Sequence, residues 1–488
     1  MSHSGMAARG AARGATRAAA RGALLAAVLL GGCSIPDTRP ALAPKAATDL
    51  GLGAAGTVAP LPQVDPSWWR AFGDPQLDRV VSDVQAGNPS LDEALARVRQ
   101  AQAALSQRRA EGAPNVTLDV NPQVSRLSGA YTIPPPYAGT VRFIGTAQAN
   151  LGYDLDLFGR QRAAIQGAAE SLRATALDVE AARLMLAGSA VQTYLELVRA
   201  ERQAAIAQTT ITARQNTVRL VQVQIRNQLA SKLDLQAATT LLAQARESLV
   251  SAQGARVLAA NALAALAGRG VDYPATLGAS ALHLDAALAL PATIPADLLA
   301  RRADVAAAQA RIEAALAGRQ VARRAFYPNV NLSALAGLQA IGIGNLFSLD
   351  AATVGAGPAI HLPIFDAGRL RAGLAGATAA VDLATASYND TVVTAVREAA
   401  DALARIGSLG EQRARQREVV RGYAETGRLN AVRVRSGLES RLDLVDNDVR
   451  LLDAQLRDVN LLTDAAVARV QLVLALGGGF DPSRDTQP

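Results

Sequence analysis

Few residues in this 488-residue chain have the type and spacing that catalysis or metal binding requires. Two Ser-x-x-Asp pairs, Ser231 with Asp234 and Ser440 with Asp443, have the spacing at which a hydroxyl and a carboxylate cap the first N–H groups of a helix. Asp446 lies three residues after Asp443, so the two carboxylates share one helix face. This pattern predicts helix starts and a local concentration of negative charge.

The other candidates predict no catalytic or metal site. His283 and His361 are the only histidines beyond His3, and they fall on a connector and at a strand end, where we interpret them as surface or lumen residues. Gly477 to Gly479 follow a helix end and lack the lysine and preceding strand of a phosphate-binding loop. No nucleophile, base and orienting residue can be assembled by spacing. We therefore expect no enzyme, no cofactor and no metal.

Composition favours closely packed helices over a bulky globular core. Half of the residues are apolar but only 3% are aromatic, and alanine, the best helix former, supplies much of the difference. Four of the 49 basic residues lie in the first 21 positions, which leaves 45 against 42 acidic residues in the remainder. This balance, without a dense basic run with interleaved aromatics, argues against a nucleic-acid partner.

The amino terminus predicts secretion. Arginines up to Arg21 precede the short apolar segment 23–30, which is typical of a signal peptide and too short for a membrane span. Leu30-Gly-Gly-Cys33 resembles a bacterial lipobox, which implies that residues 1–32 are removed and Cys33 is lipidated. Ser34 follows in place of the aspartate that retains lipoproteins in the inner membrane, which implies the outer membrane. The alternative is a chance cysteine after an ordinary signal peptide.

The body of the chain consists of two similar halves. Helical periodicity changes after Pro114 to alternation with a period of two, and Pro328-Asn-Val-Asn-Leu332 repeats Pro114-Asn-Val-Thr-Leu118. We predict a tether at 33–66, a first repeat at 67–270, a connector at 271–298, a second repeat at 299–476 and a tail at 477–488. The predicted strands are about 115–127, 143–155, 329–340 and 352–362, and the predicted long helices are about 159–228, 231–268, 367–436 and 440–476.

Each pair of long helices is predicted to meet at a tight turn. The sequence RSGLESRLDLVD at 435–446 has an altered copy, RNQLASKLDLQA, at 226–237. Gly437 suits the left-handed residue that ends the preceding helix. Gln228 replaces this glycine in the first copy, which predicts a differently made turn.

The second pair of helices has the apolar spacing of an antiparallel coiled coil. Small residues dominate the outgoing helix, which allows its partner to approach closely. The predicted seam consists of Tyr388, Val392, Ala395, Ala399, Ala402, Ile406 and Leu409 on the outgoing helix, and of Leu442, Val445, Val449, Leu452, Leu456 and Val459 on the return helix.

Four alternating strands in a secreted chain without a predicted membrane helix suggest a membrane β-barrel, because lipid tolerates only helices or closed sheets. Four strands cannot close one, since barrels begin at about eight strands. The barrel must be shared among chains. Three copies would supply twelve strands, whereas two copies would leave little room for a lumen.

The chain resembles the TolC-like outer-membrane efflux proteins, in their lipoprotein branch. The resemblance rests on the order of four features: the lipobox, the duplicated halves, the two Asp-containing turns and the run Ile294-Pro-Ala-Asp-Leu-Leu-Ala-Arg-Arg302. The resemblance implies a mainly helical homotrimer, with a 12-stranded β-barrel on a 12-helix periplasmic α-barrel. It also implies a passive export duct of a tripartite RND-type pump, docked to a periplasmic adaptor protein and an inner-membrane pump.

The same resemblance implies that the second turn closes the periplasmic mouth, where Asp443 and Asp446 match the constricting carboxylates. Asp443 has an alternative role as the capping partner of Ser440, whereas Asp446 has no such role and its first-copy counterpart is Ala237. Two alternative functions stay open. One is the exit duct of a type I secretion or metal-efflux system, and the other is a lipid-anchored periplasmic coiled-coil scaffold.

Overall fold

The structure is a computed structural model that describes residues 38–52, 64–130, 132–286, 288, 294, 297–438 and 441–481, with the backbone alone for 441–444. Cys33, Ser440 and the Asp443 side chain therefore lie outside the described residues. The chain divides into two compact units. The first contains 98–174, 309–387 and the segment up to Pro44, and the second contains 45–97, 175–308 and the residues from Tyr388 onward.

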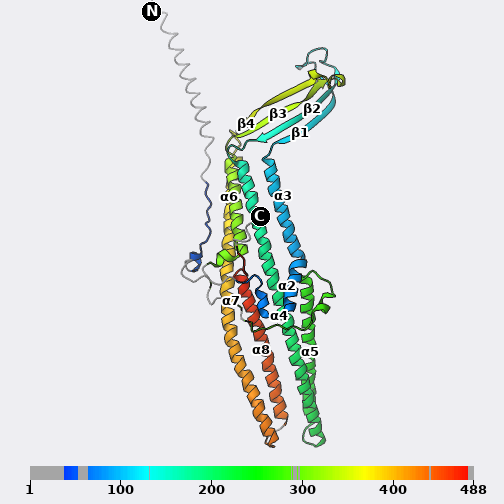
Figure 1. Ribbon diagram of the computed structural model, residues 1–488, viewed down its shortest axis with the longest axis vertical. Helices are drawn as coiled ribbons and strands as arrows, with labels where there is room; N and C mark the ends of the chain where they lie inside the picture. The colour runs from blue at the N-terminus through cyan, green and yellow to red at the C-terminus, as the bar shows by residue number, and fades with distance from the viewer. Residues whose placement is uncertain are drawn as a thin grey trace, which may run out of the picture. The chain divides into compact units, whose positions relative to one another are not determined.

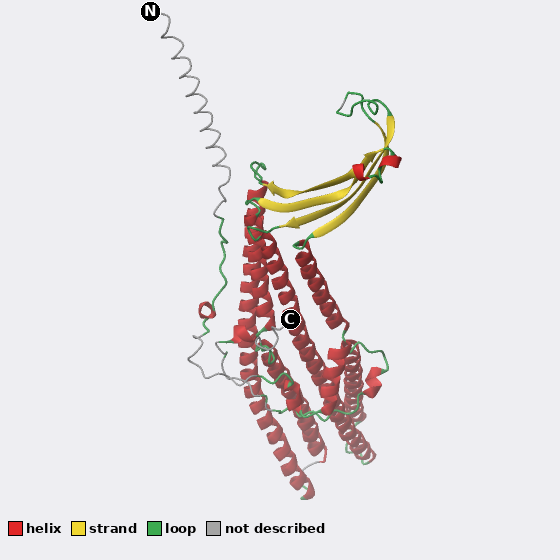
Figure 2. Cartoon of the chain, turned by 45° about the horizontal axis from the view of Figure 1, so that its top comes forward, coloured by secondary structure: helices red, strands yellow, loops and turns green. Residues whose placement is uncertain are grey.

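The first unit contains an antiparallel four-stranded sheet in the order β1 (Asn115–Arg126), β2 (Val141–Asp154), β3 (Asn329–Ile341) and β4 (Ala352–His361) (Figures 1 and 2). The helices α3 (Pro89–Glu111) and α6 (Ala303–Arg324) lead into β1 and β3. The helices α4 (Arg160–Arg226) and α7 (Arg369–Arg435) follow β2 and β4. The four predicted strands are confirmed.

The sheet has one apolar and one polar face. Because directly paired residues point to the same side, the register puts Leu118 with Ala149, and Ala149 with Ala336, on one face. Asn121, Thr146 and Gln339 lie on the other face. The apolar face is uncovered within the described residues: Leu118 is 70% exposed and Val354 is 81% exposed. Such a face needs a hydrophobic environment outside this chain.

The two long helical hairpins have equal lengths. The helices α4 and α7 each have 67 residues, and their return helices α5 (Lys232–Leu266) and α8 (Arg441–Ala475) each have 35. In Figure 1 α4 lies beside α5, and α7 lies beside α8. At 1.5 Å per residue, α4 is roughly 100 Å long. The second half therefore repeats the first in length as well as in order.

The second unit contains the main hydrophobic core. The short helix α2 (Pro75–Gly87) and the 3-10 turn Trp68–Phe72 pack against α4, α5 and α8. Tyr194 of α4 is fully buried there, and its hydroxyl donates to Asp74 Oδ2 at 2.6 Å and accepts from Gln76 Nε2 at 2.9 Å. Burial, followed by the bond to Asp74, raises the pKa of Tyr194. These bonds satisfy the polar end of a large buried side chain.

The predicted coiled-coil seam is only partly confirmed. Ala399 and Ala402 of α7 pack against Leu472 and Ala475 of α8. Val392 and Ala395, also assigned to this seam, instead pack against Val305 of α6 and Leu299. Because α8 ends at Ala475, Val392 and Ala395 near the start of the seam pack against α6 instead of α8. The α5 helix contributes a buried alanine every seventh residue, at 238, 245, 252 and 259.

One described helix, α5, is long and apolar enough to cross a membrane by length and composition, with a mean hydropathy of 1.3 over its best window. Sequence analysis predicts no such helix. Its apolar character comes largely from the alanine and leucine residues that pack against α4 and α2, so the criterion also fits a helix of this coiled-coil type. Only 28% of the window is buried within the chain, so much of α5 is free to contact another chain.

Candidate functional site at the hairpin ends and the sheet wall

The turn of the first hairpin begins α5 with a complete capping box. Ser231 Oγ accepts from the Asp234 N–H at 3.3 Å, and Asp234 Oδ2 accepts from the Ser231 N–H at 2.8 Å. Hydrogen bonds from the Ser231 backbone and hydroxyl hold the pKa of Asp234 below its ordinary value. The predicted structural role of Ser231 and Asp234 is therefore observed. The matching Ser440 and the Asp443 side chain lie outside the described residues.

Both hairpins end their outgoing helix in the same way, which corrects the prediction for Gln228. Gly437 has φ +70° and Gln228 has φ +56°, so both residues are left-handed. The Leu438 N–H donates to the Arg433 carbonyl, and the Leu229 N–H donates to the Gln224 carbonyl, each at 2.8 Å. This is the same six-residue closure in both copies. The backbone motif imposes the left-handed conformation even where the residue is not glycine.

Asp446 is exposed on the first turns of α8 and forms an ion pair with Arg450. The distance from Arg450 Nη2 to Asp446 Oδ2 is 2.8 Å, and both side chains are more than half exposed. The pairing was not among the predicted features, although the i, i+4 spacing of the two residues is a sufficient signal for it. The charge of Asp446 is therefore offset locally by Arg450.

Asp446 also lines a groove of about 520 Å³ between the two hairpins. The opposite wall comes from α4 and α5 and includes Arg214, Gln224, Asp234 and Leu241. The groove combines exposed apolar side chains with charged groups of both signs. Such a surface suits a protein segment better than an ion or a small apolar ligand.

The run ending in Arg302 stabilises the start of the second repeat. Arg302 is 9% exposed and binds Asp304 at 2.7 Å, Glu398 of α7 at 2.9 Å and the carbonyl of Ala475 at 3.1 Å. It therefore joins α7 to the C-terminal end of α8, where a cation is favourable. Leu298, from the same run, is fully buried beside Ala402. We find that this motif has a structural explanation.

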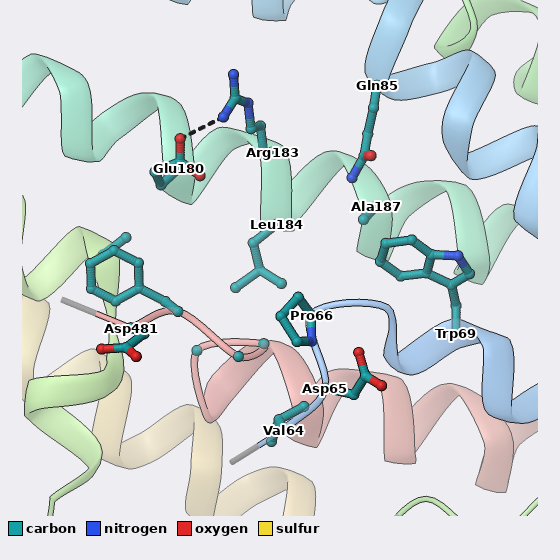
Figure 3. Close-up of a pocket in the computed structure, with 15 residues that line it drawn as sticks. Val64, Asp65, Pro66, Trp69, Gln85, Glu180, Arg183, Leu184, Ala187 and Asp481 are labelled. Atoms are coloured by element: carbon teal, nitrogen blue, oxygen red, sulfur yellow. Dashed lines mark hydrogen bonds and ion pairs between the residues drawn. The ribbon is translucent and has the colours of Figure 1, made fainter. Parts of the chain in front are cut away.

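Gly477 to Gly479 border a cavity of about 650 Å³ in the second unit (Figure 3). All three have positive φ, and a Cβ on Gly478 would lie 2.0 Å from Leu184 Cδ1. The glycines are therefore needed for close chain packing. Of the charged lining groups, Glu180 pairs with Arg183 at 2.6 Å and Asp65 accepts from the Ser67 N–H at 2.7 Å. This arrangement indicates a structural recess.

Among the described residues, no cluster of three or more His, Cys, Asp or Glu side chains could hold a metal. His283 is exposed on the connector beside Gly73, and His361 is exposed at the end of β4. His361 belongs to the first unit and His283 to the second.

A sheet with an uncovered apolar face, continued by helical hairpins, defines a subunit of a membrane channel. The model of the family described as outer membrane efflux protein matches residues 80–269 and 294–478, one segment in each repeat. The chain belongs to this family. Its relatives include the solvent efflux pump outer membrane protein SrpC of Pseudomonas putida, which is 32% identical, with 94% of this chain and 98% of SrpC covered.

Outer membrane protein OprJ of Pseudomonas aeruginosa is also 32% identical, over 94% of this chain and 96% of OprJ. Among solved structures, the outer membrane protein VceC of Vibrio cholerae superposes with a TM-score of 0.79 at 32% identity, covering 86% of this chain and all of VceC. The fold is therefore the helical barrel plus β-barrel fold of TolC-like channels. The chain is an outer-membrane channel component of an efflux system.

Proposed function

We propose that three copies of this chain form a passive exit duct of a tripartite RND-type efflux pump. The observation that carries the proposal is the uncovered apolar face of a sheet of four strands, which are 12, 14, 13 and 10 residues long. Tilted membrane strands need about 9–11 residues. Three such sheets would give a closed barrel of twelve strands, in which β1 of one copy pairs with β4 of the next.

Exposed apolar residues on the hairpins support packing against further copies. On α5, Val250 is 67% exposed, Val257 is 53% exposed and Leu258 is 70% exposed. On α7, Leu383 is 71% exposed. Large apolar side chains gathered on one helix favour burial against another protein chain. In a trimer, six hairpins would supply twelve long helices to a periplasmic tunnel.

The second hairpin turn is proposed as the periplasmic gate, with Asp443 and Asp446 as its carboxylates. Threefold symmetry would bring six of these groups around one axis, where they would favour cations. The Arg450 ion pair modifies this proposal, because Arg450 offsets the charge of Asp446 within each copy. Asp446 would then contribute to selectivity most strongly when its pair with Arg450 is broken.

The groove between the hairpin ends is the proposed docking site for a periplasmic adaptor protein, which would connect the duct to an inner-membrane pump. Its mixed charge and its exposed Leu229 and Leu241 suit a helical partner with an apolar stripe. We also propose that Cys33 is lipidated and holds the N-terminal tether in the outer membrane, as in the lipoprotein branch of the family. The names of relatives support small organic molecules, such as solvents, as cargo.

Single-channel recording of the purified protein in a planar bilayer tests the proposal. We expect a trimer in detergent and stable conductance steps after insertion. If the purified protein shows no β signal in circular dichroism, or is a monomer that never conducts, the result would instead support the lipid-anchored scaffold. If the protein conducts ions but does not give complemented cells resistance to organic solvents, the duct proposal would stand. That result would favour an exit duct of a type I secretion or metal-efflux system.

A further inference from the structure

We infer that the junction between sheet and helices in the first unit binds the phosphate of an anionic phospholipid from the periplasmic leaflet of the outer membrane. This inference rests on the proposed insertion of the sheet in that membrane. The junction contains a cavity of about 200 Å³ lined by Arg160, Arg324 and Arg369, with His361 at the end of β4. Three guanidinium groups around one small cavity match the bidentate hydrogen bonding that phosphate favours.

Arginines occur in pairs at all four helix ends that meet the sheet. The last turns of α3 and α6 carry Arg108 with Arg109 and Arg323 with Arg324, and the first turns of α4 and α7 carry Arg160 with Arg162 and Arg369 with Arg371. Cations stabilise the end of a helix but oppose the dipole at its start. Neither α4 nor α7 has an acidic residue in its first turn. Helix stability therefore does not explain the arginines at these two starts.

The acidic residues of the junction neutralise only part of this charge. Asp156 accepts from the backbone N–H groups of Gln161 and Arg162, and Asp366 accepts from those of Gly368 and Leu370. Both carboxylates thus cap helices. Three ion pairs have an exposed arginine: Arg108 binds Glu111 at 2.8 Å, Arg160 lies 3.5 Å from Asp154, and Arg162 lies 3.4 Å from Asp156.

Arg324 and Arg369 differ in what holds them. Arg324 donates to the carbonyl of Gly159, which fixes its guanidinium at the cavity. Within the part of the chain that the structure describes, no carboxylate forms a salt bridge with Arg369. Eight arginines thus face four carboxylates at the junction, Glu111, Asp154, Asp156 and Asp366, which leaves excess positive charge for an external anion.

Apolar side chains beside the cavity match the rest of a phospholipid. The rings of Phe158 and Tyr327 stack with centroids 5.0 Å apart, and both line the cavity. Phe365 is 89% exposed, Ile364 is 60% exposed and Leu157 is 61% exposed on the neighbouring loops. Aromatic rings of this kind favour the membrane interface. A free phosphate ion would use the arginines but would not require this apolar rim.

Native mass spectrometry of the detergent-solubilised full chain tests the inference, with dioleoyl phosphatidylglycerol as the probe. The variant carries Arg160→Gln and Arg369→Gln. The matched control carries Arg246→Gln and Arg421→Gln, two exposed arginines on the long helices. Because each basic residue contributes about fivefold to binding of an anionic lipid surface, we expect about 25-fold weaker binding in the junction variant and wild-type binding in the control.

Further arms identify the source of the phosphate. Dioleoylglycerol, which lacks phosphate, should not be retained, and millimolar inorganic phosphate should not displace the lipid. Equal loss in the control variant, unchanged binding in the junction variant, or preferential retention of lipopolysaccharide would overturn the inference. If the glutamine variant fails to assemble, the pair Arg160→Lys and Arg369→Lys keeps the charge but removes the bidentate geometry, and it should bind the lipid several-fold more weakly than the wild type; unchanged binding would overturn the inference. If the protein binds the lipid through these arginines but never conducts ions, the proposed channel function would be rejected and the proposed lipid site would be retained.

Discussion

The hydroxyl of Tyr194 donates to the carboxylate of Asp74 at 2.6 Å, and this bond joins the long helix α4 to the N-terminal cap of α2. Asp74 also accepts from the backbone N–H groups of Gln76 and Ala281. One carboxylate therefore ties α2, α4 and the connector together inside the main core.

Tyr194→Phe should destabilise this core, because it leaves Asp74 and Gln76 with one buried hydrogen bond fewer. We expect a loss of about 1–3 kcal/mol, measured as a lower thermal midpoint of helical circular dichroism in detergent. Tyr423→Phe, in which the altered hydroxyl has no described hydrogen bond, is the matched control and should change the midpoint little. Equal shifts in the two variants would contradict the assigned role of the bond.

The two hairpin turns allow a reciprocal exchange. Gly437→Gln places a side chain at φ +70° where no neighbouring atom lies within 4 Å, so the cost is conformational strain of about 1 kcal/mol. Gln228→Gly removes the same strain from the first turn and should be neutral or stabilising by a similar amount. Chemical denaturation of both variants gives the comparison. A stabilising Gly437→Gln would show that the common turn geometry is wrong.

Gly478→Ala should be far more harmful than Gly437→Ala, although both glycines have positive φ. At Gly478 the new Cβ would meet Leu184 at 2.0 Å, whereas at Gly437 it would meet open space. Overpacking typically adds about 1–3 kcal/mol to the backbone strain. Limited proteolysis at increasing temperature separates the two variants, and similar protease resistance would argue against the tight packing around the cavity.

The ion pair at the proposed gate predicts opposite effects for its two members. Asp446→Ala should weaken cation preference and raise conductance, because three carboxylates are lost from the mouth of the trimer. Arg450→Ala should strengthen cation preference, because it leaves those carboxylates uncompensated. Reversal potentials in a salt gradient measure both effects. If the two substitutions shift selectivity in the same direction, Asp446 does not act through its charge.

The capping box at Ser231 predicts a pH dependence at the first turn. The pKa of Asp234 is lowered in the folded state, so its ionised form stabilises the turn above the unfolded value of about 3.9. This contribution is lost as the pH falls through the folded pKa. Asp234→Asn should therefore lower the thermal midpoint at pH 7 and approach the wild type below about pH 3. A constant difference across this range would exclude the carboxylate as the cause.

Alternation of apolar and polar residues was sufficient to predict the strands, since a sheet with one lipid-facing side repeats every two residues. The Ser231 cap was predictable for a similar reason, because its partner lies three residues away. Gln228 was not, because the energetic cost of a left-handed glutamine is small enough for the hairpin closure to impose it. The partners of Val392 and Ala395 depended on where α8 ends in space, and apolar spacing along α7 carries no such information.

The equal lengths of the two hairpins restrict how this chain can change in evolution. A deletion of one heptad from α4 and α5 alone would keep the alanine packing in register but would leave the first arm about 10 Å shorter than the second. Adaptation to a periplasm of different depth therefore requires matched changes in both halves. Recombination between family members should succeed most often when it exchanges complete hairpin pairs.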